Sequence, residues 1–188
     1  SEPVTPIKSR RHDPSVPKHA ARLHRAWPLA LGLLFLFSSA WRIYHAHSLQ
    51  HSLLANSLSL DARVYWEWAS AIVRSGPLGH NPFFLGPLYP YVLALIRRCA
   101  GDSVGTVLIV QSLWGALATA LLADAARRLT TPLIGLAVGI FLAGYQMAIF
   151  FDGLVLMESL LYVLEAILLW LVVRDSAWGA GAAPFTAL

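Results

Sequence analysis

Long apolar runs separated by short polar breaks are the main pattern along this 188-residue chain. A helix needs about 20 predominantly apolar residues to cross a membrane whose hydrocarbon core is about 30 Å thick. Four runs predict such helices, over about 27–44, 104–122, 132–151 and 160–173. The pattern therefore predicts an all-α fold, a polytopic transmembrane helical bundle with about four spans.

A long segment, residues 45–103, separates the first two predicted spans and is expected to carry interfacial helices. Its stretch from Asp61 to Arg74 predicts an amphipathic helix, because polar side chains follow one helical face and apolar side chains the other. The polar face comprises Arg63, Glu67, Ser70 and Arg74, and the apolar face comprises Val64, Tyr65, Trp68, Ala71 and Ile72. Such a helix is expected to lie in the headgroup plane of the membrane.

The stretch from Phe83 to Leu95 is apolar but short, and Pro87 and Pro90 interrupt it. Apolar segments of about 10–14 residues are more often interfacial or re-entrant than spanning. We therefore expect this stretch to stay on the outer side of the membrane. A crossing is the alternative, and it would put Asp61 and Asp152 on opposite faces.

The composition is that of an integral membrane protein. Hydrophobic residues make up 57% of the chain and charged residues 13%, and the mean hydropathy is +0.59. Soluble domains carry about 25% charged residues, so the deficit is large. The single cysteine, Cys99, excludes an intrachain disulfide.

Basic residues predict the orientation, because lysine and arginine are enriched in cytoplasmic segments. Six of them precede the first span: Lys8, Arg10, Arg11, Lys18, Arg22 and Arg25. Residues 1–26 also contain four prolines and few large apolar residues, which predicts a disordered cytoplasmic tail. Its expected partner is anionic lipid rather than nucleic acid. The same orientation puts Arg127, Arg128 and Arg174 inside and leaves Arg42 with the arginines of the external loop.

The compact loops favour a bacterial inner membrane over the endoplasmic reticulum. Residues 176–188 are interpreted as a linker or the start of a further span. The chain is therefore expected to be the front part of a larger protein.

Asp61 and Glu158 are the main candidates for chemistry, and both are expected on the outer face. An acid at the edge of hydrocarbon is costly and usually has a partner or a function. Structural explanations stay open, since Asp61 is a favoured helix N-cap and Glu158 complements a helix dipole. Asp152 is interpreted as a mark of the membrane edge or a turn. Glu165, near the middle of the fourth span, is a further functional candidate.

The histidines predict no metal site. His45, His47 and His51 have spacings of two and four, but no HExxH pattern accompanies them, so they are interpreted as interfacial. His80 lies in a loop that is expected to face the candidate site.

The external loop contains an ordered set of motifs. They are Asp61, Tyr65 and Ala69 in the pattern D-x3-Y-x3-A, then Gly76, then P-L-Y-P at 87–90, then Gly101. This order resembles the first external loop of GT-C glycosyltransferases that use polyprenyl-phosphate sugars, such as protein O-mannosyltransferases and aminoarabinose transferases. Glu158 matches the position of the second acid of that family. The resemblance covers roughly residues 27–175.

The resemblance implies an inverting sugar transfer to an acceptor hydroxyl on the external face. Asp61 would act as general base, and Glu158 would orient the acceptor or the base. The implied substrate-binding residues are Arg63, Tyr65, His80, Tyr89 and Arg97, the arginines serving the leaving phosphate. Many relatives have two adjacent acids where this chain has Asp61 and Ala62, which leaves a divalent cation open as cofactor. The alternatives are a transporter fragment, in which Glu165 would be central, and a non-catalytic membrane scaffold.

Overall fold

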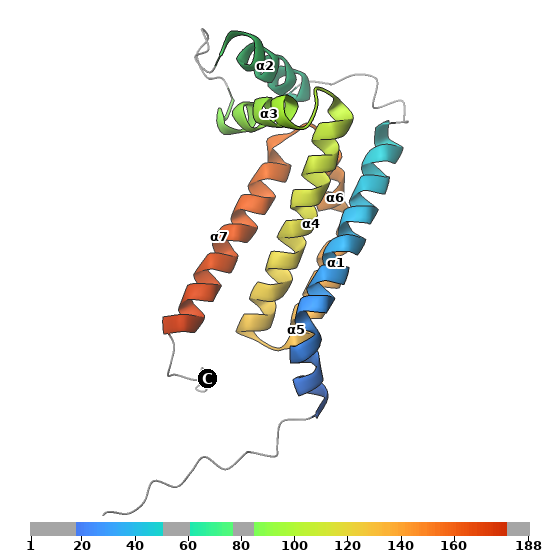
Figure 1. Ribbon diagram of the computed structural model, residues 1–188, viewed down its shortest axis with the longest axis vertical. Helices are drawn as coiled ribbons and strands as arrows, with labels where there is room; N and C mark the ends of the chain where they lie inside the picture. The colour runs from blue at the N-terminus through green and yellow to red at the C-terminus, as the bar shows by residue number, and fades with distance from the viewer. Residues whose placement is uncertain (1–17, 51–60, 77–84, 180–188) are drawn as a thin grey trace, which may run out of the picture.

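The computed structural model describes residues 18–50, 61–76 and 85–179, with side chains over 25–50, 61–76 and 85–175, and its regular structure is helical. In chain order the helices are α1 (Lys18–Gln50), α2 (Asp61–Ser75), α3 (Leu88–Cys99), α4 (Val104–Leu129), α5 (Pro132–Ala143), α6 (Gln146–Asp152) and α7 (Met157–Gly179). Figure 1 shows α1, α4 and α7 along the length of the molecule, with α2 and α3 across one end. The predicted all-α class is confirmed.

Two helices are long and apolar enough to cross a membrane, namely α4 and the part of α1 from Arg25 to Gln50. The pair α5 and α6 makes a third if its two halves form one bent span. The outer face of α1 exposes large apolar side chains, among them Leu33, Leu36 and Phe37. An exposed apolar face of this length is typical of a helix in contact with lipid.

The third predicted span, 132–151, is wrong as a single helix. It is broken into α5 and α6, whose axes differ by 54°. Gly144 caps the end of α5, and Tyr145 takes an extended backbone conformation before α6 begins. The apolar run does not reveal this break, because the hydropathy of a segment does not depend on the backbone angles of Gly144 and Tyr145.

The start of α1 also corrects the predicted tail. The helix begins at Lys18, so residues 18–26 of the predicted tail are helical. The rest of the predicted tail, residues 1–17, lies outside the described part of the chain. Alanine, leucine and arginine, which are strong helix formers, dominate this stretch. The helix therefore continues beyond the apolar run that predicted it.

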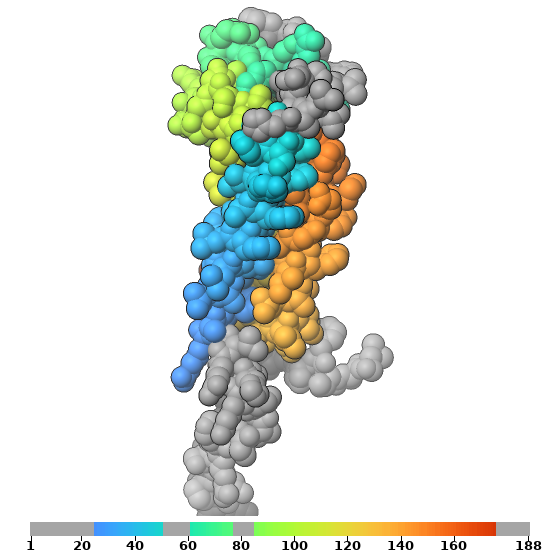
Figure 2. Space-filling model, turned by 90° about the vertical axis from the view of Figure 1, so that its right-hand side faces the viewer, coloured from blue at the N-terminus to red at the C-terminus, as the bar shows by residue number. Residues whose placement is uncertain are grey.

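Glycines allow α5 to pack closely against its neighbours. A Cβ at Gly135 would lie 2.8 Å from the carbonyl oxygen of Ala123, and one at Gly139 would lie 2.4 Å from Cδ2 of Leu34. Small residues four apart let helix backbones approach, as in membrane helix pairs. Figure 2 shows the result from the side, with α1 lying along α5 and α6.

The buried carboxylate of Asp124 joins three helices at the end of the bundle opposite α2 and α3. It accepts hydrogen bonds from the indoles of Trp27, at 2.8 Å, and Trp170, at 2.9 Å. Arg127 and Arg128, from its own helix, also donate to it. These bonds tie α1 and α7 to the C-terminal end of α4.

Helices α2 and α3 pack against each other and cap the bundle. The predicted helix from Asp61 to Arg74 is confirmed, but its buried stripe is Tyr65, Ala69 and Ile72. Val64 and Ala71, predicted on the apolar face, are exposed. The buried residues follow an i, i+4, i+7 spacing, which is the face that α3 covers.

The stretch from Phe83 to Leu95 does not cross the bundle. Its described part enters α3, which has 12 residues. At 1.5 Å per residue this helix is about 18 Å long, too short for a hydrocarbon core of about 30 Å. The length of α3 thus agrees with an interfacial or re-entrant position, which stays a prediction.

Candidate functional site

The two predicted catalytic acids lie in the first turns of different helices. Asp61 begins α2, and Glu158 is the second residue of α7. Both residues are exposed. An acid in the first turn of a helix interacts favourably with the helix dipole, so each position is compatible with its local structure.

Two buried tyrosines, Tyr65 on α2 and Tyr89 on α3, sense the charges of these acids. The rings of Tyr65 and Tyr89 meet edge to face, with centroids 5.0 Å apart and an interplanar angle of 82°. Burial raises the pKa of Tyr65, and the charges of Glu158 and Asp61 raise it further. Burial also raises the pKa of Tyr89, with smaller effects from Tyr65 and Glu158. The charges of an acid from α2 and an acid from α7 thus act on the same tyrosine, Tyr65.

The hydroxyl of Tyr89 connects α3 to the turn that precedes Glu158. It donates to Oε1 of Gln111 at 2.8 Å, and the amide nitrogen of Gln111 donates to the carbonyl of Leu154 at 2.6 Å. Gln111 is fully buried. Buried amides need such partners, so this chain of bonds fixes the α6–α7 turn relative to α3. The tyrosine of the P-L-Y-P motif thus supports the position of Glu158.

Asp152 is the last residue of α6 and precedes a turn, which agrees with one of its two interpretations, but its carboxylate also has an interior partner. It is 1% exposed, and its Oδ2 lies 2.8 Å from Nε of Arg42. Arg42, predicted to lie on the outer side near the end of the first span, is also 1% exposed and pairs within the bundle. Its other hydrogen bonds go to Ser38, to Thr119 and to the carbonyl of Leu142.

Two further residues complete the surroundings of this ion pair. The hydroxyl of Ser159 donates to Oδ1 of Asp152 at 2.7 Å. A Cβ at position 115 would lie 2.1 Å from Oδ2, so Gly115 provides the space for the carboxylate. Charges are tolerated in an apolar interior when they are paired and hydrogen-bonded, and this pair meets that condition.

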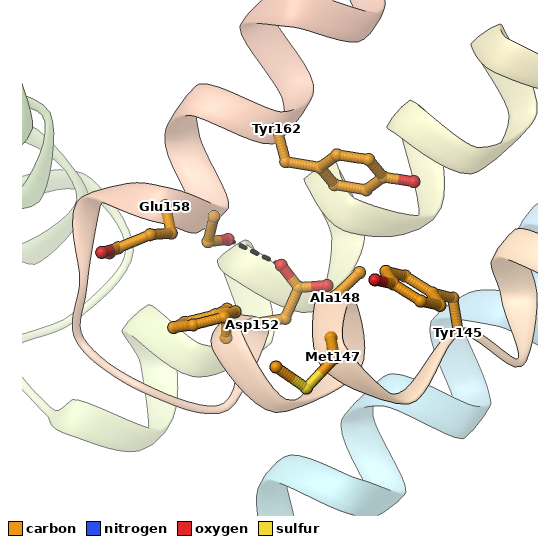
Figure 3. A pocket seen from close by; sticks show the side chains of 8 residues that line it. Tyr145, Met147, Ala148, Asp152, Glu158 and Tyr162 are labelled. Carbon is orange, nitrogen blue, oxygen red and sulfur yellow. Dashed lines mark hydrogen bonds between the residues drawn. The ribbon is translucent and has the colours of Figure 1, made fainter.

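A hollow of about 300 Å³ lies beside this ion pair, between α6 and α7. Its lining is Tyr145, Met147, Ala148, Phe151, Asp152, Glu158, Ser159 and Tyr162. Figure 3 shows Asp152 among these side chains, while the carboxylate of Glu158 is turned away from it. Glu158 is therefore common to the hollow and to the surroundings of the tyrosine pair.

The predicted substrate-binding arginines have protein partners. Nε of Arg63 lies 2.7 Å from Glu67 on the exposed face of α2, and this contact raises the pKa of Arg63. Arg97 is largely buried and joins α3 to α2 and to the following loop. It donates to Asp102 at 2.6 Å and to Ser70 at 2.6 Å. These hydrogen bonds give Arg97 a structural role, because they hold α3 against α2 and the following loop. The predicted contact of Arg97 with the leaving phosphate stays a prediction.

The remaining predictions have mixed outcomes. His80 lies outside the described residues. Tyr65 and Tyr89 pack against each other, and the charge of Glu158 raises the pKa of both, whereas Asp61 acts on Tyr65. Among the residues that the structure describes, no group of three or more histidines, cysteines or acids lies together as a metal site requires.

Several residues near the hollow escaped sequence reasoning, above all Arg42, Asp152 and Gln111. One signal was available for Arg42, because it follows Ser38 by four residues on one helix face and ends an apolar run. Its pairing with Asp152 joins positions 110 residues apart, and no local pattern encodes that contact.

No family model, curated protein or solved structure matches this chain. The GT-C resemblance therefore rests on the motifs of the external loop and on Glu158 alone.

Proposed function

We propose that this chain forms part of an integral membrane glycosyltransferase of the inverting GT-C type. It would transfer a sugar from a polyprenyl-phosphate donor to an acceptor hydroxyl on the external face. The observation that supports this proposal is that the charges of Asp61, on α2, and Glu158, on α7, both raise the pKa of the same residue, Tyr65. Two acids on separate helices at one end of a bundle are the minimum that the proposed chemistry needs.

In this proposal α1, α4, the bent pair α5 and α6, and α7 are the four spans. Helices α2 and α3 lie at the external membrane surface, and the N-terminus is cytoplasmic. The distribution of charge favours this orientation, because Arg127 and Arg128 lie at the end of the bundle away from α2 and α3. The proposed membrane is the bacterial inner membrane.

Asp61 takes the role of general base. Its exposed carboxylate removes the proton from the acceptor hydroxyl as that oxygen attacks the anomeric carbon. The polyprenyl phosphate leaves from the opposite side of the sugar, which inverts the configuration. Arg74 and Arg98 are exposed on α2 and α3 and supply positive charge for the departing phosphate.

Glu158 orients the acceptor, and the hollow beside it holds the donor chain. The side chains of Met147, Phe151 and Tyr162 give the hollow an apolar lining. Such a surface suits an isoprenoid chain, because burying hydrocarbon against hydrocarbon removes it from water. The phosphate end of the donor would then lie toward Glu158 and α2.

Sugar transfer in membranes containing the protein tests the proposal. We expect Asp61→Asn to reduce transfer from a polyprenyl-phosphate sugar by about 10²-fold or more, the effect of losing a general base. Glu67→Gln is the matched control, because Glu67 is an exposed acid on the same helix. Equal rates for the two variants would exclude Asp61 as the base. A donor preference for nucleotide sugars would exclude the proposed donor class.

A transporter is the second candidate, and the buried pair Arg42 and Asp152 is the observation that favours it. Ionisable pairs inside membrane bundles often mark ion or substrate pathways, and this pair adjoins a hollow. In a transporter, Asp152→Asn would abolish uptake into proteoliposomes and Asp61→Asn would not. In the proposed transferase, Asp61→Asn is the more damaging change.

A further inference from the structure

Two arginines from different helices flank the indole of Trp170. The guanidinium carbon of Arg128, on α4, lies 5.7 Å from the ring centroid, and that of Arg174, on α7, lies 5.3 Å from it. Both arginines are exposed. The arrangement holds two positive charges beside one aromatic ring, at the end of the bundle away from α2 and α3 (Figure 1).

The nearby carboxylate does not use up this positive charge. Asp124 accepts hydrogen bonds from two indoles and two arginines, so its oxygens are fully occupied. Arg128 reaches it through Nε alone, and within the described residues its Nη groups make no hydrogen bond. Arg174 makes no hydrogen bond to Asp124. The donors that remain point to an anion from outside the protein, since guanidinium groups are suited to phosphate.

The surroundings favour a lipid over a free anion. Leu168 and Leu171, on the same helix as Trp170, are large exposed apolar residues, at 64% and 41%. Tryptophan is enriched where membrane proteins meet the headgroup region, and basic residues beside it attract anionic lipid. A phospholipid would match both surfaces: its phosphate would lie at the two arginines, and its acyl chains would lie along the exposed leucines of α7.

We propose that Arg128, Trp170 and Arg174 form a binding site for the headgroup phosphate of an anionic phospholipid. The site lies at the cytoplasmic surface in the orientation given above. Its occupation would brace the C-terminal ends of α4 and α7 against each other. The proposal is independent of the catalytic role of Asp61, because the two sites lie at opposite ends of the bundle.

Native mass spectrometry of the full chain in detergent, titrated with phosphatidylglycerol or phosphatidylcholine, tests this site. We expect retained phosphatidylglycerol, and about fivefold weaker binding in Arg174→Gln, the usual contribution of one surface arginine. Arg25→Gln, an exposed arginine on α1 outside the proposed site, is the control and should bind as the unmodified chain does. The double variant Arg128→Gln with Arg174→Gln should bind more weakly still.

Three results would overturn the proposal. The first is equal loss in Arg174→Gln and Arg25→Gln, which would mean that any exposed arginine contributes equally. The second is equal retention of phosphatidylcholine. The third is displacement of phosphatidylglycerol by excess inorganic phosphate, which would assign the site to a free anion. Arg174→Gln leaves every hydrogen bond of Asp124 intact, so it decides the question even if loss of Arg128 unfolds the chain.

Discussion

Nε of Arg42 lies 2.8 Å from Oδ2 of Asp152, and both side chains are buried in the centre of the bundle. The pair joins α1 to the end of α6, immediately before the turn that leads to Glu158. It is a buried ionic link between the first helix and the candidate site. The position of the turn therefore depends on a contact between residues 110 positions apart in the sequence.

Removing one partner of this pair should destabilise the fold strongly. Arg42→Met leaves the carboxylate of Asp152 buried without its cation, and such changes cost about 3–5 kcal/mol. Arg63→Gln, which breaks an exposed pair screened by solvent, should change the melting temperature little. Thermal unfolding in detergent measures both. Similar melting temperatures for the two variants would show that the buried pair contributes little.

The space beside Asp152 predicts a large effect of one methyl group. Gly115→Ala would put a Cβ 2.1 Å from Oδ2, and overpacking of this kind costs about 1–3 kcal/mol. Gly32→Ala is the control, because a Cβ there meets nothing within 4 Å and alanine favours helix. Thermal unfolding should show Gly115→Ala destabilised and Gly32→Ala unchanged or more stable. The reverse order would contradict the packing described for Asp152.

The hydroxyl of Tyr89 should matter more than its ring for the position of Glu158. Tyr89→Phe leaves the buried side chain of Gln111 without its donor, at a cost of about 1–3 kcal/mol. Sugar transfer should fall as well, because the α6–α7 turn loses its connection to α3. Tyr44→Phe, at an exposed tyrosine, should change neither quantity. A Tyr89→Phe protein with full stability and full transfer would show that the hydrogen bond from Tyr89 to Gln111 does not position the turn.

Tyrosine ionisation tests the nearness of the two acids without any assay of function. The negative charges of Asp61 and Glu158 raise the pKa of Tyr65, so neutralising either acid should lower that pKa. Ultraviolet titration should therefore show earlier ionisation in Asp61→Asn and in Glu158→Gln, but not in Glu67→Gln. An unchanged titration in both acid variants would mean that the acids act elsewhere.

The same pKa shift fixes the sign of an alkaline effect on stability. The unfolded chain releases the Tyr65 proton near pH 10, whereas the folded chain keeps it to higher pH. The folded state therefore binds more protons above about pH 10, and stability falls as the pH rises through that range. Chemical unfolding measured on both sides of pH 10 should show this decline, and Tyr65→Phe should reduce it.

Local patterns predicted much of the fold. The apolar runs located α1, α4 and α7, and the helical period from Asp61 located α2. The break at Gly144 was not predictable, because it depends on backbone angles within a run that is apolar throughout. The buried face of α2 was only partly predicted, since which stripe is covered depends on where α3 lies.

The candidate site was predicted in outline only. The helical starts at Asp61 and Glu158 follow from local sequence, but their nearness to Tyr65 depends on the packing of α2, α3 and α7. Arg97 shows the limit most clearly. Its position in an external segment suggested a substrate contact, whereas its partners Ser70 and Asp102 occupy it within the protein.

The most direct test of the central claim is a double-mutant cycle on sugar transfer with Asp61→Asn and Glu158→Gln. Residues that act as a unit are strongly non-additive, so the double variant should be about as slow as the slower single variant. Glu67→Gln combined with Asp61→Asn is the control. A double variant whose loss equals the product of the two single losses would mean independent sites and would contradict a shared one. Full sugar transfer in Asp61→Asn, in Glu158→Gln and in their double variant would contradict the proposed transferase activity.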